Sequence, residues 1–384
     1  MLTEKELENA IQHITDRFDE VNHLYVQKIA AQIKKIGEMN ASSINRIVVM
    51  TDMGADVREI TRALAQAAAM SIREIYQVYQ TALSDSYTDP RFARALERQP
   101  LTKEQNARLT QFAQNVSTQT AQTMLNLSNT TSVRPQYKAA IDRAIIATST
   151  GLTSYKEAAR DIIREAGSNG LQVYYESGYH RRLDTAVRQN IIDGVNQINQ
   201  NASLAMGEAL GYDAIEISAH ANSAPDHEPV QGRVFLKSEF EKMQAGEDFH
   251  DVDGNFYEGF RRPIGEWNCM HIARSFSTKH SIRTYTDAQL KQWAANNAKG
   301  CEFNGKHYTI YQARQLMRQL ETKVRQEKDA ANAARTNGND MEVRKACQKN
   351  INALSKQYYA VAQAAGLKPR GDRLSVEGFK MVKA

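Results

Sequence analysis

Residues 4–36, EKELENAIQHITDRFDEVNHLYVQKIAAQIKKI, set the architecture of this 384-residue chain. Large apolar side chains recur there at every third or fourth position: Leu7, Ile11, Ile14, Phe18, Val21, Tyr25, Ile29, Ile33 and Ile36. That spacing follows the turn of an α-helix and places these side chains on one face. The sequence predicts one long amphipathic helix. A stripe with a period near 3.5 residues fits either a coiled coil with a partner or packing against the same chain.

Two further helical patterns follow in the first third of the chain. Apolar residues repeat at helical spacing from near Asp56 to Tyr79. Another helix is predicted to open at Thr102, because Gln105 follows three residues later and the pair can form a capping box. Residues 1–130 are therefore predicted to be an N-terminal helical region, either elongated or bundled.

Residues 131–285 are predicted to form a compact core of mixed α and β structure. The sequence indicates helices at 136–148 and about 154–167, a β-prone run at 171–178, a long helix at about 180–209, and a half-buried strand at 213–218. From residue 218 to 280 the periodic patterns stop, and a long polar loop is predicted. Loops of this length in compact proteins are usually functional or held by specific contacts.

Residues 286–384 are predicted to form a basic C-terminal helical hairpin and tail. The stretch FNGKHY, 303–308, contains Asn-Gly, which favours a type I′ β-turn. Two helical seams then follow, joined by TNGND at 336–340, and Gly366 is expected to end the second helix. Residues 301–384 hold sixteen Lys and Arg against eight Asp and Glu. This charge favours either contact with phosphate or an acidic protein, or a solvated helical arm.

The fold class predicted from these patterns is mainly α, with a small β component. Hydrophobic residues make up 41% of the chain, which is enough for real cores. Three scattered cysteines are too few for a disulfide framework, so a reducing compartment is expected. No apolar stretch reaches the ~20 residues that a membrane-spanning helix needs, so no membrane association is expected.

Four side chains in and near the polar loop could gather around one metal ion: His220, His227, Cys269 and His271. Imidazole and thiolate are zinc ligands, and Cys269 and His271 form a feasible local pair. The alternative is a structural clasp, in which the histidines bond backbone groups of a loop that has few ladder hydrogen bonds of its own. Both interpretations stay open, and the sequence indicates no cofactor other than this candidate zinc.

A hydrolytic site is a weaker hypothesis for the same loop. It would use acidic and histidine side chains: Asp226, His227, His250, Asp251 and Asp253. The stretch HDVDGN, 250–255, also resembles the start of a calcium loop, but position 262 is an arginine where the bidentate glutamate is needed. The sequence has no glycine-rich phosphate loop and no Gly-x-Ser-x-Gly elbow, so no catalytic residue is predicted.

Three arginines stand at the start of the predicted helix near residue 180. Arg181, Arg182 and Arg188 are candidates for contact with phosphate or an acidic partner. The alternative is a solvated helix face with an internal Arg–Asp pair.

Several segments together resemble one known family. VYYESGYHRRLDTAVRQNI at 173–191, EISAHANSAPDHEPVQGRVF at 216–235, GEWNCMH at 265–271 and YTIYQARQLMRQLETKVRQEK at 308–328 occur in the order and spacing of phage minor capsid proteins. The similarity is to the minor capsid protein 2 type, which looks related to the Mu F-like head morphogenesis proteins of tailed bacteriophages. It spans about residues 125–330.

The resemblance implies a shared loop skeleton around the four candidate ligands: Pro225, Asp226, Gln231, Gly232 and Asn268. Three positions depart from the family pattern. Ala224 and Met270 stand where the family usually has arginine, and Val230 where it has tryptophan. A phosphate-binding role of those arginines would not carry over to this chain, whereas a folded clasp would.

The resemblance also implies a function. Such proteins are structural head components of low copy number, attached to the portal inside the capsid, and they assist head assembly, DNA packaging or DNA delivery. The expected partner is the portal protein, with the major capsid or scaffolding protein as further candidates and non-specific DNA contact through residues 301–384. The expected location is the virion, after synthesis in the host bacterial cytoplasm. Two rival hypotheses are a zinc-dependent hydrolase or toxin-like transferase centred on the loop, and a DNA-binding helical adaptor.

Overall fold

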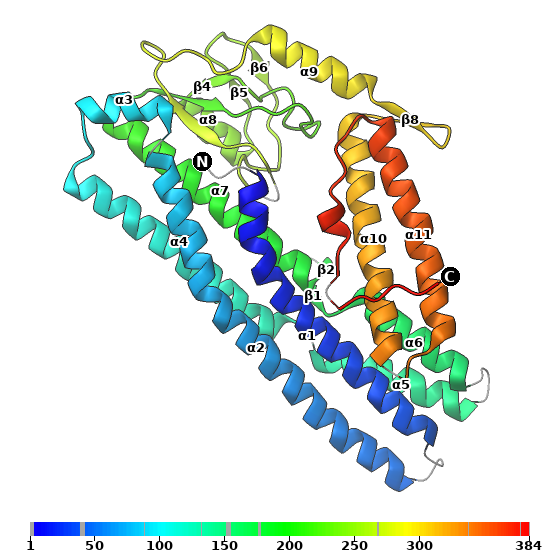
Figure 1. The fold of residues 1–384 in the computed structure, drawn as a ribbon. Helices are drawn as coiled ribbons and strands as arrows, with labels where there is room; N and C mark the ends of the chain where they lie inside the picture. Colours follow the sequence, from blue (N-terminus) through cyan, green and yellow to red (C-terminus); the bar gives the residue numbers. More distant parts are fainter. Residues whose placement is uncertain are drawn as a thin grey trace.

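The computed structural model describes residues 4–38, 43–87, 89–131, 133–150, 155–175, 178–266, 269–336, 338–376 and 378–383. The chain is mostly helical with small antiparallel sheets, so the predicted mainly-α class is confirmed. Long helices lie side by side in a bundle, the sheet region covers one end of it, and a helical hairpin stands along its flank (Figure 1).

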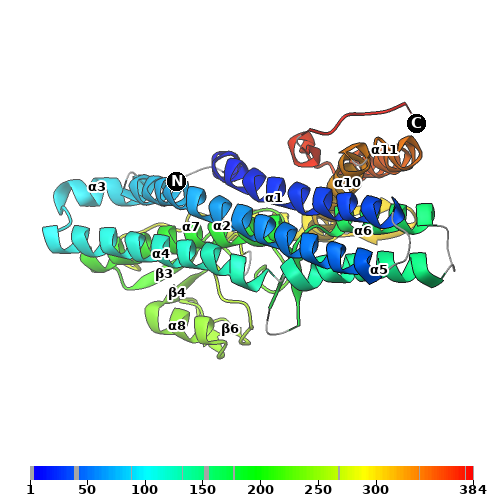
Figure 2. The ribbon, with the colours of Figure 1, turned by 90° about the horizontal axis from the view of Figure 1, so that it is seen from below.

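The bundle is built by the first two hundred residues. Its helices are α1 (Glu4–Glu38), α2 (Ser43–Tyr87), α3 (Pro90–Arg98), α4 (Lys103–Thr130), α5 (Val133–Thr150), α6 (Tyr155–Asn169) and α7 (Leu183–Ala209). Seen from below, α1 and α2 lie side by side, and α2 lies against α4 and α5 (Figure 2). The predicted capping box opens α4: Gln105 N–H donates to Thr102 Oγ1 at 3.2 Å, and Thr102 N–H donates to Gln105 Oε1 at 2.8 Å.

The apolar stripe of α1 is buried inside its own chain. Its side chains from Ile11 to Ile36 are at most 8% exposed; the side chain of Leu7 lies outside the described set. Helix α1 packs against α2, α5, α6 and α7, and also against α10 far along the sequence. The open question about the stripe is thereby answered: it forms the core of an intramolecular bundle.

One close contact sets how α2 meets α7. The hydroxyl of Tyr79 on α2 shares a 2.9 Å hydrogen bond with Thr120 Oγ1 on α4. The same hydroxyl lies over Gly194 on α7, where an added Cβ would come within 1.9 Å of it. Glycine at position 194 therefore makes room for a buried tyrosine that joins three helices.

The central sheet has three antiparallel strands, with β3 (Ala214–Ile217) between β4 (Val234–Leu236) and β7 (Ala273–Phe276). All four residues of β3 are buried, so the prediction of a half-buried strand was wrong. The polar residue that produced the alternating pattern, Glu216, is itself inside. Its carboxylate accepts hydrogen bonds from the N–H and the hydroxyl of Thr284, both at 2.6 Å.

The stretch 218–280 is more regular than the predicted polar loop. It contains β4, α8 (Lys237–Ala245), β5 (Phe249–His250), β6 (Phe256–Tyr257) and β7. The HDVDGN segment is the turn between β5 and β6. The carboxylate of Asp251 accepts bonds from the N–H groups of Asp253 and Asn255 and from the hydroxyl of Tyr257, at 2.9–3.0 Å. These bonds organise a hairpin, so the resemblance to a calcium loop is local only.

Several helix boundaries differ from those predicted. Helix α2 begins at Ser43, well before Asp56. The strand β2 (His180–Arg182), which pairs with β1 (Gln172–Tyr174), takes the first residues of the helix predicted from 180. Helix α6 continues past Gly167 to Asn169. The glycine allows close packing instead of ending the helix, since a Cβ there would lie 2.8 Å from Ala330 Cα on α10.

The C-terminal region agrees with its predicted outline. It comprises α9 (Asp287–Lys299), β8 (Cys301–Phe303), β9 (Lys306–Tyr308), α10 (Ile310–Thr336), α11 (Met341–Ala364) and the short 3₁₀ helix η1 (Gly371–Leu374). Asn304 and Gly305 have φ of 51° and 72°, as a type I′ turn requires. Helices α10 and α11 form the antiparallel hairpin, and α10 also packs on α6 and α1.

The glycine at the α2–α7 contact gives a direct test of this packing. We expect Gly194→Ala to destabilise the protein by about 1–3 kcal/mol, because the new methyl group collides with the buried ring of Tyr79. The matched control is Gly54→Ala in α2, where the nearest atom to a new Cβ is a flexible arginine end at 3.6 Å. That change should be neutral or stabilising. Urea unfolding followed by circular dichroism compares the two, and equal effects would contradict the packing argument.

Candidate functional site

A buried cluster of His227, Cys269 and His271 lies beside the central sheet. His227 comes from the connection between β3 and β4, and the other two come from the connection between β6 and β7. Cys269 Sγ is 3.2 Å from His227 Nδ1 and 3.5 Å from His271 Nδ1. The three residues are 0%, 1% and 2% exposed. Each offers a metal-ligand atom, and these atoms lie within 4.8 Å of one another.

The far nitrogen of each ring is held by an acceptor. His227 Nε2 is 2.8 Å from the carbonyl oxygen of Arg262. His271 Nε2 is 3.2 Å from Ser223 Oγ and 3.4 Å from Gln231 Oε1. Carbonyl oxygens only accept hydrogen bonds, so the ring protons belong on the two Nε2 atoms. Both Nδ1 lone pairs then face the cysteine sulfur.

His220 lies beside this cluster. Its ring stacks on His271 with the centroids 4.5 Å apart, and it contributes no atom to the three-ligand group. Its backbone N–H donates to Gln231 Oε1 at 3.0 Å. Of the four residues singled out from the sequence, the structure brings three together at one point and packs the fourth against them.

Burial keeps these groups neutral. It lowers the pKa of His220 to about 4, and it lowers the pKa values of His227 and His271 as well. It raises the pKa of the Cys269 thiol. In each case desolvation of the charged form is the largest cause. Near pH 7 the cluster therefore consists of neutral imidazoles and a thiol.

The predicted skeleton residues hold the loop in place around the cluster. Gly232 N–H donates to the carbonyl of Ile217 at 2.9 Å, and its φ of 66° suits glycine. Asp226 accepts two hydrogen bonds from Arg262, at 2.7 and 2.9 Å, which ties the two connections together. Pro225 is exposed at the turn. Asn268 lies outside the described residues.

The three departures from the family pattern occupy different surroundings. Ala224 is buried, and its carbonyl accepts hydrogen bonds from the next turn of the loop. Val230 is 2% exposed and belongs to the apolar core under the loop. Met270 is 38% exposed and lines a pocket between α7 and α10.

The hydrolytic set considered from the sequence does not gather at one place. His250 lies 3.7 Å from Glu239 of α8, and Asp251 and Asp253 belong to the β5–β6 turn. Only Asp226 is near His227, and its carboxylate pairs with Arg262.

Arg182 lies at the centre of a buried ionic network. Its guanidinium is 3.1 Å from Asp184 of α7 and 3.0 Å from Asp329 of α10, and it donates to the carbonyl of Ser168 at 3.0 Å. Asp19 of α1 is 3.7 Å away. The side chain of Arg182 is only 8% exposed, so the expectation that it contacts phosphate or a partner was wrong. Of the alternative, a solvated helix face with an internal Arg–Asp pair, the pair is present but the face is buried.

The other two arginines of that segment have separate environments. Arg181 bonds Gln189 and lies over the rings of Tyr175 and Tyr179, 5.9 and 5.1 Å from their centroids. Arg188 lines the pocket between α7 and α10. These environments neither support nor contradict contact with phosphate or a partner, so such contact stays a prediction for Arg181 and Arg188.

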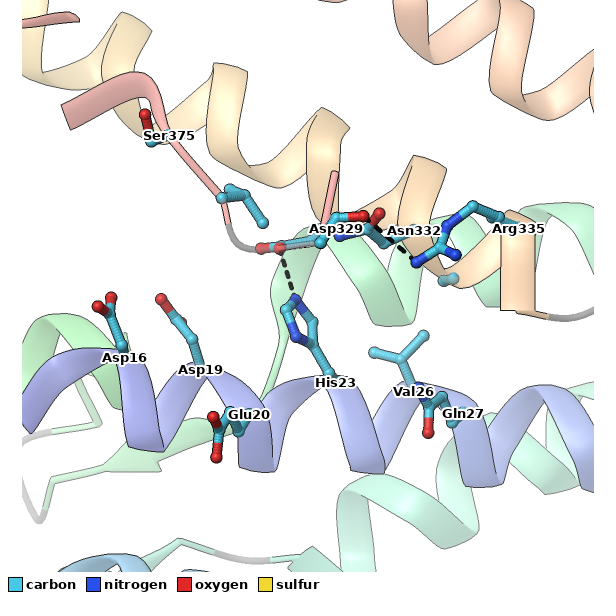
Figure 3. Close-up of a pocket in the computed structure, with 13 residues that line it drawn as sticks. Asp16, Asp19, Glu20, His23, Val26, Gln27, Asp329, Asn332, Arg335 and Ser375 are labelled. Atoms are coloured by element: carbon cyan, nitrogen blue, oxygen red, sulfur yellow. Dashed lines mark hydrogen bonds and ion pairs between the residues drawn. The ribbon is translucent and has the colours of Figure 1, made fainter. Parts of the chain in front are cut away.

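The other side of this network lies on α1, whose polar residues were not among the candidates from the sequence. Figure 3 shows a pocket between α1 and α10 in which His23 points at Asp329, 3.2 Å away. This hydrogen bond raises the pKa of His23. For Asp184, burial opposes ionisation, but Arg182 and Arg325 outweigh it and lower its pKa. One feature of the sequence could have indicated this contact: Asp19 and His23 lie one helical turn apart on α1, so they share a polar position on the helix surface.

A family model described as Phage minor capsid protein 2 matches residues 2–361. The chain belongs to this family. Comparisons with curated proteins and with solved structures find no match.

As a phage minor capsid protein, the chain has a structural role in the virion. The resemblance found from residues 125–330 is confirmed and extends over nearly the whole chain. None of the helices in the described ranges is long and apolar enough to cross a membrane.

The ionic network of this minor capsid protein can be tested by removing its centre. We expect Arg182→Met to destabilise the protein by about 3 kcal/mol, because it removes the cation that the buried carboxylates of Asp184 and Asp329 share. Asp184 keeps Arg325 at 3.6 Å, and Asp329 keeps His23 at 3.2 Å.

Arg108→Met is the matched control, since Arg108 makes an exposed pair with Glu104 and should change stability by less than about 0.5 kcal/mol. Urea unfolding measures both. A loss below about 1 kcal/mol for Arg182→Met would refute a central role.

Proposed function

We propose that this minor capsid protein is a low-copy structural component attached to the portal on the inner side of the capsid, where it assists head assembly, DNA packaging or DNA delivery. The observation that carries the proposal is the family match over residues 2–361 of a chain whose helices form one cross-braced body. Such a body suits a rigid part that docks on a larger assembly. The portal is the preferred partner, ahead of the major capsid and scaffolding proteins.

The burial of the cluster supports a structural rather than an enzymatic role. His227, Cys269 and His271 are at most 2% exposed, so a substrate has no access to them in this conformation. Their pKa shifts arise from desolvation in the interior and keep each group uncharged. The zinc hydrolase or toxin-like transferase alternative requires an accessible reactive group, which this cluster does not offer.

Co-expression with the portal protein of the same phage tests the proposal. We expect size-exclusion chromatography and mass photometry to show a defined complex of the portal ring with a few copies of this chain. Mixing the separately purified proteins is the control for assembly during folding. If rings and free chain elute apart in both experiments, portal attachment is refuted.

A second candidate function, contact with DNA, rests on one face of α11. Lys345, Lys349 and Lys356 are exposed at positions that share a helix face. A row of lysines on a rigid helix can neutralise successive phosphates without reading bases. This supports the expectation of non-specific DNA contact through residues 301–384 and refines it to three side chains.

Neutralising this face should weaken DNA binding in a salt-dependent way. The triple variant carries Lys345→Gln, Lys349→Gln and Lys356→Gln. We expect the plot of the logarithm of the DNA association constant against the logarithm of salt concentration to become less steep by about 3. Each lost lysine accounts for about one unit, because it no longer neutralises a phosphate. The matched control replaces the same lysines with arginine and should keep the slope. Fluorescence anisotropy with duplexes of unrelated sequence measures both. An unchanged slope in the glutamine variant would exclude α11 as the DNA-binding face.

A further inference from the structure

The donor atoms of His227, Cys269 and His271 have the spacing of a metal-coordination sphere. Zinc–sulfur and zinc–nitrogen bonds of about 2.3 and 2.05 Å at a tetrahedral angle place sulfur and nitrogen about 3.5 Å apart. The observed distances from Cys269 Sγ to the two Nδ1 atoms are 3.2 and 3.5 Å. Both sulfur–nitrogen distances are therefore close to the edge length of a zinc tetrahedron, and the three ligand atoms lie within 4.8 Å of one another.

The surroundings of the two histidines also match those of metal ligands. Ligating histidines usually donate the other ring N–H to a carbonyl or carboxylate, which orients the ring and fixes the tautomer. Here His227 Nε2 is held by the carbonyl of Arg262, and His271 Nε2 by Gln231 Oε1 and Ser223 Oγ. The hydroxyl of Ser223 is 3.3 Å from the carbonyl of Ala224, where it can donate its own proton. Ser223 Oγ is then an acceptor for His271.

A metal-free clasp satisfies these atoms less well. One thiol proton can serve only one of the two Nδ1 lone pairs that face the sulfur. The other contact of His227 Nδ1 is Arg262 Nη2 at 3.4 Å, which is long for a hydrogen bond, while the second N–H of that nitrogen donates to Asp226 at 2.7 Å. Asp226 also offsets the charge of Arg262 beside the site. An ion at the meeting point of the three lone pairs satisfies all of them at once.

We propose that His227 Nδ1, His271 Nδ1 and Cys269 Sγ bind one zinc ion that fastens the connection between β3 and β4 to the connection between β6 and β7. On binding, the thiol proton leaves to solvent and the thiolate takes its place as a ligand. The fourth position of the ion falls to a solvent molecule or to His220, which stacks on His271. The ion is structural, because the cluster is closed to substrates. The proposal does not depend on attachment to the portal.

Cobalt(II) is the probe for this site, because a thiolate ligand gives it a near-ultraviolet charge-transfer band and tetrahedral geometry gives it intense visible bands. We expect the full-length chain, purified with a chelator and then dialysed free of it, to bind one cobalt ion with both signatures and to release it to zinc. Cys269→Ser should lose the charge-transfer band, and His271→Ala should lower the affinity at least ~10-fold.

The chain supplies matched controls for these variants. Cys301 and Cys347 are buried cysteines outside the cluster, so Cys301→Ser and Cys347→Ser should keep the full cobalt spectrum. Far-ultraviolet circular dichroism checks the fold of each variant. If Cys269→Ser does not fold, the wild-type protein still decides: a chelator should lower its Tm, and one equivalent of zinc should restore it. A wild-type chain with no stoichiometric cobalt spectrum, or a spectrum that survives Cys269→Ser, overturns the proposal.

Discussion

The guanidinium of Arg182 joins parts of the chain that are far apart in sequence. It contacts the end of α6 through the carbonyl of Ser168, the start of α7 through Asp184, and α10 through Asp329. A buried cation needs carboxylates around it, because desolvation of an unpaired charge costs several kcal/mol. The relative positions of α6, α7 and α10 are therefore coupled by charge as well as by apolar packing. His23 of α1 completes the connection through Asp329.

The molecule has a second buried polar centre, which lies at the sheet. The Cys–His cluster lies where irregular connections meet at the sheet, rather than between helices. Its groups are neutral, whereas Arg182 and Asp184 form a pair of opposite charges. Both centres do the same structural work, since each cross-links segments that lack regular backbone pairing to one another.

Local features of the fold were predictable from the sequence. The stripe of α1, the Thr102–Gln105 cap and the Asn304–Gly305 turn each depend on residues a few positions apart. The burial of strand β3 was not predictable in this way, because the burial of Glu216 depends on Thr284, 68 residues away. Gly167 resembles a helix stop in the sequence. The reason for the glycine is its close contact with Ala330 of α10, which local sequence does not show.

The candidate site was predictable only in its residue types. Histidine and cysteine near a proline-rich turn drew attention to His220, His227, Cys269 and His271, but spacing could not tell which of them share a centre. The arginines at 181, 182 and 188 looked equivalent in the sequence. Their environments differ because the carboxylates that surround Arg182 come from other elements, Asp19 of α1 and Asp329 of α10.

The hydrogen bond between His23 and Asp329 spans 306 residues of sequence. At a synthesis rate of ~5–20 residues per second, the ribosome needs about 15–60 seconds to make the second partner after the first. During that interval α1 can assemble with α2, but the face that carries Asp19 and His23 has no α10 to cover it. Helix α10, which is translated late, therefore covers part of α1, and a product truncated before α10 exposes a charged seam that the longer chain partly buries.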